Sequence, residues 1–434
     1  MKKVDKLHQP GPEDATNTSR RDFIKKTSAA AALVAAPALL TKFARASERP
    51  IKLGYVVPLT GPLAAFTEPS DFVVKGAQKA FANGITVNGK NYPVQIIVKD
   101  SQSAPTRAAE VTAELIKSDN VDLMLGAHTG DTCVPVSDQC EINGVPCCTG
   151  DDPVEAWFFG RNGNPAKGFE WTYHFFWGDN DMIAVYMGMW DSLPTNKTVG
   201  ELSPNDNDGR AVSEIFPPLL KPRGFKLIDP GRFNIMTTDY ASEIAQFKQT
   251  KAEIVTGVLP PPAFSTFWQQ AAQQGYKPKI CTMAKASLFP AAVGSYGDRG
   301  IGLTSEVWWS PFHPFRSSLT GQSSAELCAD WEKQTGKQWT QPMGFEHALF
   351  EIANDVLKRA KSVSPDAIRD ALRTTDCKTI VGPIKFADKI PNVCRTPLVG
   401  GQWVRGKKYP LEVEIIFNGT YPGIPKTGTL KPLA

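Results

Sequence analysis

The sequence lacks an apolar run long enough to cross a membrane. The Ala-rich, uncharged stretch at residues 28–40 spans only 13 residues, whereas a membrane helix needs about 20. This stretch follows basic residues and precedes an Ala-Arg-Ala sequence, the order of parts in a cleavable export signal. We therefore expect residues 1–46 to be an export signal peptide, cleaved near Ala46, and the rest of the chain to be periplasmic.

The basic part of this signal contains adjacent arginines. Arg20 and Arg21 precede an aromatic residue, an aliphatic residue and a lysine, and the stretch at residues 19–25 resembles the twin-arginine export motif. An ordinary secretory signal with adjacent arginines is the alternative. Either route predicts that the chain works outside a bacterial inner membrane.

An excess of basic charge is also absent once the signal is set aside. The signal holds nine Lys or Arg and four Asp or Glu, so 39 positive and 40 negative side chains remain among 388 residues. A nearly neutral body without a basic cluster provides no electrostatic surface for nucleic acid or an anionic membrane. We expect no nucleic-acid partner.

Motifs of cofactor-dependent and hydrolytic enzymes are missing. The sequence has no Walker phosphate loop, no G-x-S-x-G, no H-E-x-x-H and no C-x-x-C-H motif. The acidic run at residues 205–209 does not fit a calcium loop, because Pro204 and Ile215 would occupy two ligand positions. We therefore expect no enzyme activity, no cofactor and no metal, and an exported cofactor enzyme remains the least favoured alternative.

Cysteine is not scarce. All eight cysteines follow residue 46, where an oxidising compartment permits disulfides. Cys377 and Cys394 come closest to an isolated pair, and both a disulfide and buried thiols remain open.

Strand and helix patterns alternate along the chain. Strands are expected at 51–57, 94–98 and 121–125, with helices at 71–82 and 105–117 between them. An irregular, aromatic-rich stretch at residues 152–177 interrupts the pattern, and a second alternating series follows. Because 388 residues exceed the usual limit of about 250–300 for one core, two α/β domains with parallel sheets are predicted.

Several segments resemble a known family in their order and spacing. They are "IKLGYVVPLTGPLAAF", "VDLMLGAHTG", "INGVPCCTG", "NDNDGR", "GFEHALFEIANDVLKRA" and "TIVGPIKF". They resemble the type I periplasmic solute-binding proteins of ABC importers, in the group that binds leucine, isoleucine and valine. The resemblance implies two doubly wound parallel-sheet lobes joined by a three-crossing hinge. Lobe one would comprise residues 47–174 plus 284–388, and lobe two residues 175–283 plus 389–434.

The resemblance also implies a ligand site in the cleft between the lobes. This agrees with the general rule that open α/β sheets bind ligands beyond the carboxyl ends of their strands. Two loops of lobe one would hold a ligand carboxylate, through Thr129, Gly130, Asp131, Thr132, Thr149, Gly150 and Asp151. Other loops after strands add the candidates Phe66, Asn207, Asp208, Phe264 and Lys285. Threonine, glycine and aspartate are also common in turns and helix caps, which is the structural alternative.

One loop departs from the pattern of amino acid binders. They oppose the ligand ammonium with an acidic residue of lobe two, but residues 259–264 contain no carboxylate. The ammonium site could have moved to the aspartates of lobe one, or the ligand could be another compound. Hydrophobic amino acids and aromatic or other organic acids both remain open. Aromatic walls suit either class, and the candidates are Phe66, Trp157, Trp177, Phe264, Trp308 and Trp309.

The resemblance predicts a monomeric receptor that captures a small-molecule ligand and delivers it to an ABC permease in the inner membrane. Ligand contacts to both lobes would favour the closed form. A periplasmic ligand-sensing receptor is the alternative.

Overall fold

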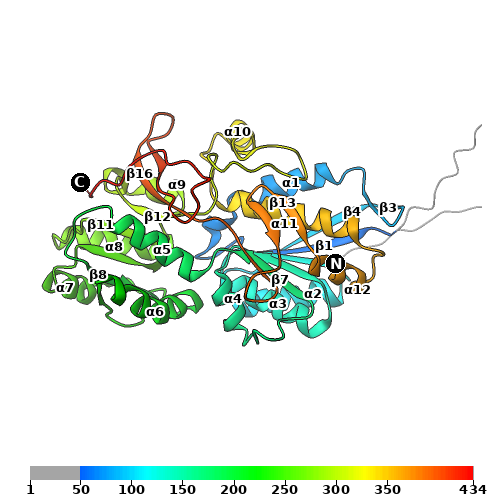
Figure 1. Ribbon diagram of the computed structural model, residues 1–434, viewed down its shortest axis with the longest axis horizontal. Helices are drawn as coiled ribbons and strands as arrows, with labels where there is room; N and C mark the ends of the chain where they lie inside the picture. Colours follow the sequence, from blue (N-terminus) through cyan, green and yellow to red (C-terminus); the bar gives the residue numbers. More distant parts are fainter. Residues whose placement is uncertain (1–48, 434) are drawn as a thin grey trace, which may run out of the picture. The chain divides into compact units, whose positions relative to one another are not determined.

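The computed structural model describes residues 49–433, except for the side chain of Asn207. The predicted export signal, with its adjacent arginines and its cleavage point near Ala46, lies outside the described residues. The described chain contains two large β-sheets and two short hairpins. Helices pack against both sheets (Figure 1). We call the first sheet with its helices lobe one, and the second sheet with its helices lobe two.

Lobe one is built on a six-stranded sheet in which every neighbouring pair is parallel. Strand β1 lies between β4 and β5, so the chain winds first to one side of β1 and then to the other. This reversal is a topological switch point, where α/β sheets bind ligands. In spatial order the strands are β15 (Val393–Arg395), β7 (Thr172–Phe176), β6 (Cys147–Gly150), β5 (Leu123–Ala127), β1 (Ile51–Val57) and β4 (Val94–Asp100).

Lobe two is built on a seven-stranded mixed sheet. Five neighbouring strands are parallel, and two antiparallel strands complete one side. The order is β17 (Leu411–Phe417), β16 (Val399–Arg405), β12 (Thr304–Val307), β11 (Ile280–Lys285), β10 (Ile254–Leu259), β8 (Thr198–Leu202) and β9 (Lys226–Ile228). Both faces are buried, because Ile254 and Val255, neighbours in β10, belong to different hydrophobic clusters.

The helices of lobe one cover the two faces of its sheet (Figure 1). They are α1 (Ser70–Ala80), α2 (Pro105–Lys117), α3 (Gly130–Asn143), α4 (Val154–Gly160), α10 (Ser324–Thr335), α11 (Pro342–Arg359) and α12 (Pro365–Arg373), with the short helix η1 (Ala64–Thr67). Two hairpins complete the lobe: β2 (Ile85–Val87) with β3 (Lys90–Tyr92), and β13 (Asp376–Thr379) with β14 (Gly382–Lys385). Helix α12 begins with Pro365 behind Ser364, whose hydroxyl accepts a hydrogen bond from the backbone N–H of Ala367, as N-capping requires.

The helices of lobe two are α5 (Asp179–Trp190), α6 (Asn207–Leu220), α7 (Ala241–Gln249), α8 (Pro261–Gln273) and α9 (Pro290–Ser295). The short helices η2 (Lys221–Arg223) and η3 (Gly297–Gly300) lie in the same lobe. Helix α5 contacts α6 and strands β12, β16 and β17. Its first residue comes three residues after the last residue of β7, so it directly follows the first crossing between the lobes.

The stretch at residues 152–177, predicted to be irregular, contains helix α4 and strand β7. That prediction is wrong because every residue of β7 is buried. A strand buried on both faces has no alternation of polar and apolar side chains by which to recognise it. The missed strand matters, because its carboxyl end leads into the pocket described below.

The sheets place all three crossings later in the chain than expected. The predicted boundary at residues 174/175 falls inside β7, which belongs to the first sheet. Strand β12, assigned to lobe one by the predicted boundary at residues 283/284, pairs with β11 and β16 in the second sheet. Strand β15, assigned to lobe two by the boundary at 388/389, pairs with β7 in the first sheet. Both strands are short, and partners distant in sequence hold them in place, so local patterns do not reveal their lobe.

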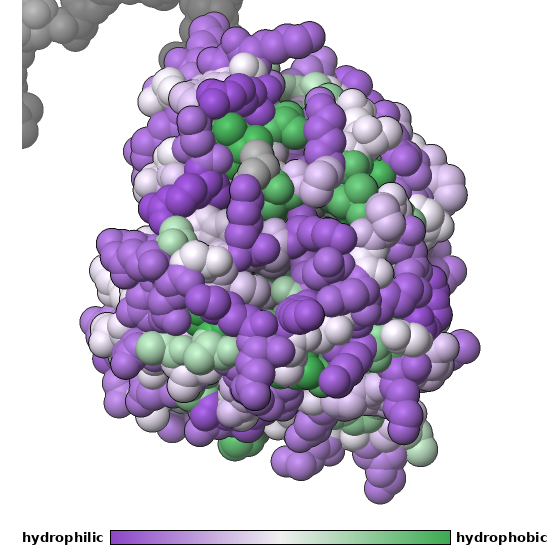
Figure 2. Space-filling model, turned by 90° about the vertical axis from the view of Figure 1, so that its left-hand side faces the viewer, coloured by the Kyte–Doolittle hydropathy of each residue, from purple (hydrophilic) through white to green (hydrophobic). Residues whose placement is uncertain are grey.

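The eight cysteines all lie in the described part of the chain and are buried free thiols. Cys377 and Cys394 therefore do not form a disulfide, and of the two options, a disulfide or buried thiols, the structure has buried thiols. On the face drawn in Figure 2, hydrophilic residues cover most of the surface and hydrophobic residues gather in limited patches. Among residues 49–433, no helix combines the length and the apolar character of a membrane span.

Candidate ligand-binding site

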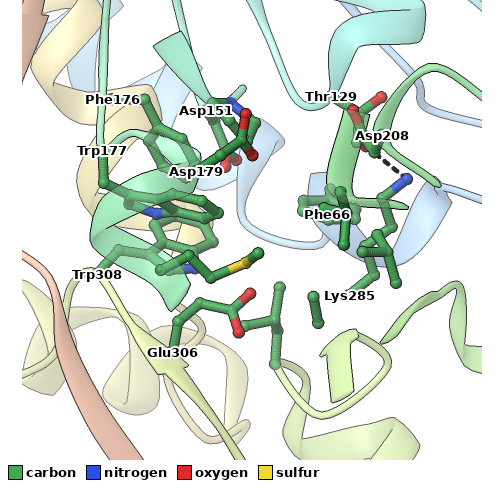
Figure 3. Close-up of a pocket in the computed structure, with 16 residues that line it drawn as sticks. Phe66, Thr129, Asp151, Phe176, Trp177, Asp179, Asp208, Lys285, Glu306 and Trp308 are labelled. Carbon is green, nitrogen blue, oxygen red and sulfur yellow. Dashed lines mark ion pairs between the residues drawn. The ribbon is translucent and has the colours of Figure 1, made fainter. Parts of the chain in front are cut away.

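A narrow pocket with a cavity volume of about 40 Å³ lies where strand ends from both sheets meet (Figure 3). From lobe one, Thr129 follows β5 and Asp151 follows β6. From lobe two, Lys285 ends β11 and Glu306 lies in β12. The other lining residues are Phe66, Pro153, Phe176, Trp177, Asp179, Met182, Asp208, Val212, Val258, Ala284, Leu288 and Trp308. A ligand in this pocket would contact both lobes.

Aromatic rings form one wall of the pocket. The rings of Phe176 and Trp177 have centroids 4.5 Å apart, and Trp308 meets Phe176 edge to face at 5.3 Å. All three side chains are nearly fully buried. Phe176 ends β7, Trp177 follows it, and Trp308 follows β12, so the wall forms where the first two crossings leave the sheets. Flat apolar walls with few polar groups are typical of sites for small organic molecules.

A buried ionic cluster lies behind the lobe-one side of the pocket. His128 Nδ1 is 2.5 Å from the Asp151 carboxylate, and His128 Nε2 is 3.2 Å from that of Glu346. The Tyr55 hydroxyl donates a hydrogen bond of 2.8 Å to the other Glu346 oxygen. Burial alone would lower the pKa of His128, but the two carboxylates raise it from 6.5 to about 9. At neutral pH, His128 is therefore an imidazolium that neutralises and orients Asp151.

A second ionic group lies on the lobe-two side. Lys285 Nζ is 2.6 Å from Asp208 and 3.4 Å from Asp206 (Figure 3 marks the Asp208 pair). Burial would lower the pKa of Lys285, but these carboxylates and that of Asp131 raise it above its ordinary value of 10.5. Asp206 also caps α6, because its side chain accepts a hydrogen bond from the backbone N–H of Gly209. Lys285 is charged and already paired.

Several buried polar atoms at the pocket have no hydrogen-bond partner among the described residues. They are both carboxylate oxygens of Asp179, Oδ1 of Asp208, the Thr129 hydroxyl and the indole nitrogens of Trp177 and Trp308. Buried polar groups are normally hydrogen bonded, since leaving one unpaired costs about 1–3 kcal/mol. Such a group of acceptors and donors around one pocket indicates a site for a polar ligand.

The backbone is strained at the same strand ends. His128, Thr129, Asp151 and Lys285 have φ angles of 72°, 66°, 71° and 62°, a region that residues other than glycine rarely adopt. Thr129 combines its φ with a ψ of 159°, a conformation that is essentially restricted to glycine. Strain of this kind concentrates at ligand sites, because the surrounding structure must enforce it.

The structure brings together part of the predicted site. Phe66, Thr129, Asp151, Asp208 and Lys285 line the pocket. Asn207 is the first residue of α6, but its side chain lies outside what the structure describes. Gly130, Asp131, Thr132, Thr149, Gly150 and Phe264 are not among the residues that line it.

Three of the residues outside this lining have other contacts. The Thr149 hydroxyl lies 2.8 Å from His174 Nδ1, and Thr132 lies 3.1 Å from Ser101. Phe264 packs on Trp268 in the core of lobe two, with ring centroids 5.5 Å apart. Of the aromatic candidates, Phe66, Trp177 and Trp308 line the pocket, whereas Trp157, Phe264 and Trp309 do not.

Sequence reasoning missed Asp179, Met182 and Glu306 as lining residues. Asp179 and Met182 belong to the first turn of α5, directly after the unrecognised strand β7. The sequence pattern predicts no strand there, so it indicates no site loop beyond residue 176. The signal that could have found them is the aromatic run "TYHFFW" followed by Gly178 and Asp179, a strand end before a helix start.

Comparison with known proteins supplies the family context. Residues 50–406 match the family described as periplasmic binding protein. "Leu/Ile/Val-binding protein homolog 3" of Brucella melitensis is 25% identical over 222 residues, which are 49% of this chain. That alignment spans only 55% of the relative's own length. "Leu/Ile/Val-binding protein homolog 7" of Brucella abortus is 23% identical over 382 residues, covering 82% of this chain and 90% of the relative.

Solved structures share the fold. One is an ABC transporter solute-binding protein from Rhodopseudomonas palustris BisB5, crystallised with 3,4-dihydroxybenzoic acid. The two folds superimpose with a TM-score of 0.68 at 17% sequence identity, over 86% of this chain and 99% of the other. The two-lobed α/β fold of solute-binding proteins is therefore confirmed for this chain.

Proposed function

Because the chain belongs to the periplasmic binding protein family, we propose that it is the extracytoplasmic substrate-binding receptor of an ABC importer. It captures a small organic solute by closure of its two lobes. The observation that carries this proposal is the pocket itself, whose lining alternates between strand ends of lobe one and lobe two. A ligand that contacts both lobes stabilises the arrangement in which they approach each other.

The three crossings between the lobes supply the hinge. The third crossing starts at Arg395, whose guanidinium pairs with Glu155 of lobe one at 2.6 Å and with Asp181 of lobe two at 2.9 Å. Gly178, in the first crossing, lies so close that a Cβ there would be 1.7 Å from Arg395 Nη1. Arg395 in the third crossing thus lies against the first crossing and pairs with a residue of each lobe, and the lobes move about these few residues.

The receptor acts with an ABC permease of the inner membrane and catalyses no reaction. It works in the periplasm as a monomer after removal of the signal near Ala46. The relatives' names point to leucine, isoleucine or valine, and the complex of the Rhodopseudomonas protein points to an aromatic acid. Both are small organic solutes with an apolar body, which suits the aromatic wall of the pocket.

Binding is tested with residues 47–434, unfolded and refolded to remove any bound solute. A thermal-shift screen against hydrophobic amino acids, amines, aromatic acids, amides and polyols should give at least one clear rise in melting temperature. A ligand at 100 times its dissociation constant adds about 2.7 kcal/mol to stability. Small-angle scattering should then show that this ligand makes the protein more compact. A screen without any stabilising compound, or binding without compaction, would contradict the proposal.

A further inference from the structure

Asp179 differs from the other carboxylates of the pocket. Asp151 contacts His128, Asp208 pairs with Lys285, and Glu306 accepts a hydrogen bond from Tyr186. Both carboxylate oxygens of Asp179 lack a partner among the described residues, although the side chain is only 1% exposed. Its backbone N–H donates to Glu155 at 2.9 Å, which anchors the residue at the start of α5. The side chain meanwhile lines the pocket (Figure 3).

The charges around the pocket favour a cation. Four carboxylates line it, and Lys285 is the one lysine or arginine among the 16 lining residues. Lys285 already pairs with Asp208 and Asp206. A ligand carboxylate would therefore find no unpaired lysine or arginine in the lining, but a ligand ammonium would meet the unpartnered Asp179. An isolated buried carboxylate is unfavourable unless it is paired or protonated.

The aromatic wall supports the same conclusion. Trp177 and Trp308 line the pocket beside Asp179, on the side of the pocket that Figure 3 shows at the left. The faces of indole rings attract cations, and the interaction strengthens when water is excluded. The indole N–H groups of both tryptophans also lack partners among the described residues. They can donate hydrogen bonds to an acceptor elsewhere on the same ligand.

Resting on the proposed function, we infer that the ligand carries a protonated amine that binds the Asp179 carboxylate beside Trp177 and Trp308. This assigns the ammonium site to the first turn of α5 rather than to the Asp151 side of lobe one. It includes amino acids and amines with an apolar body. It excludes compounds whose only charge is a carboxylate, such as 3,4-dihydroxybenzoate.

The first test compares compounds of matched shape with the wild-type protein by calorimetry. One series is L-leucine, 3-methylbutylamine and 4-methylpentanoate, and the other is phenylalanine, 2-phenylethylamine and 3-phenylpropanoate. In at least one series, the compounds with an amine should bind and the acid should not. Binding of an acid as tightly as its amine counterpart overturns the inference. If no compound of either series and no amide or polyol binds, the solute-binding function itself fails, and the amine site with it.

The second test removes the charge of Asp179. Asp179→Asn keeps the shape of the side chain, and it should weaken binding of the amine about tenfold or more. Burial and the nearby carboxylates raise the pKa of Asp179 well above its ordinary value of 3.8 in the ligand-free protein. The ligand-free variant should be at least as stable as the wild type, because it removes a buried carboxyl group that lacks a partner. A merely structural role predicts the opposite pair of results: lower stability with unchanged affinity.

The matched control is Asp191→Asn, at the other end of the same helix. Asp191 pairs with Lys197 and Arg223 and is not among the pocket-lining residues. Affinity for the amine should stay at the wild-type value in this control. Equal affinity in Asp179→Asn and the wild type overturns the assignment. The compound series with the wild-type protein decides the question independently if the Asp179 variant does not fold.

Discussion

Two fully buried histidines of the first sheet have opposite charge states. His128, directly after β5, lies between the carboxylates of Asp151 and Glu346, and its pKa is raised to about 9. His174, within β7, lies 2.6 Å from the carbonyl oxygen of Asp152 and 2.8 Å from the Thr149 hydroxyl. Burial lowers the pKa of His174 to about 3. Both side chains are excluded from water, so burial does not decide the charge; the partners do.

The two histidines have different structural roles: His128 positions a residue of the pocket, and His174 connects strands of the sheet. The charged His128 holds Asp151, which lines the pocket, so its cluster sets the electrostatics of the lobe-one side. The neutral His174 stacks on Trp157 with centroids 4.9 Å apart and interplanar angle 14°. It joins two neighbouring strands inside lobe one. Each role can be disrupted by a single substitution, with a different result.

The largest difference should come from replacing each histidine by glutamine. His128→Gln leaves Asp151 and Glu346 buried without a cation, which should lower the free energy of unfolding by about 3–5 kcal/mol. His174→Gln disturbs neutral hydrogen bonds and the stacking on Trp157, and it should cost about 1–3 kcal/mol. Urea unfolding at pH 7 measures both variants. Equal losses, or a larger loss in His174→Gln, would mean that His128 is not charged in the folded protein.

The pH dependence of stability should differ in a second way. The folded-state pKa of His128 lies above its ordinary value of 6.5. The stability that His128 contributes is therefore fully present below pH 6.5 and is lost as pH rises through about 9. The folded-state pKa of His174 lies below 6.5. The stability that His174 contributes is therefore fully present above pH 6.5 and is lost as pH falls towards 3.

Melting curves between pH 4 and 10 measure both effects. The decline in stability above pH 6.5 should shrink in His128→Gln and persist in His174→Gln. Stability should also fall as pH decreases from about 6.5 towards 3, partly because His174 becomes protonated on unfolding. That part of the decrease in stability should disappear only in His174→Gln. If the alkaline slope is the same in all three proteins, the comparison fails for His128.

The smallest effect should come from the threonines beside the two histidines. Thr129 has a strained backbone, so Thr129→Gly should remove strain of about 1–3 kcal/mol. Glycine gains more conformational freedom on unfolding, which offsets this gain by about 0.5–1 kcal/mol. The variant should be as stable as the wild type or up to about 2 kcal/mol more stable. Thr149→Gly has no positive φ to relieve and loses the contact with His174. It should be less stable, and a stability loss in Thr129→Gly would show that the conformation is not strained.

Several elements could be predicted because their signals are local. Examples are the strand at residues 51–57, the helix at 105–117 and the helix start at Ser364-Pro365, whose signals all depend on neighbours within a few residues. The loops after β1, β5, β6, β8 and β11 could be named as site loops for the same reason, and each supplies at least one lining residue. Within these loops, sequence could not decide which side chain faces the pocket. Thr149 and Thr129 both follow the predicted pattern, but only Thr129 lines it.

The sequence by itself determined the class of fold, the number of lobes and the position of most loops around the pocket. These follow from hydrophobic period, turn residues and chain length, all of which act over short distances. Only the tertiary structure decided the pairing of β7 with β15, the charge on His128 and the unpartnered state of Asp179. Each of these depends on residues far apart in the chain, such as His128 and Glu346, whose distance and burial set the energy of a charge.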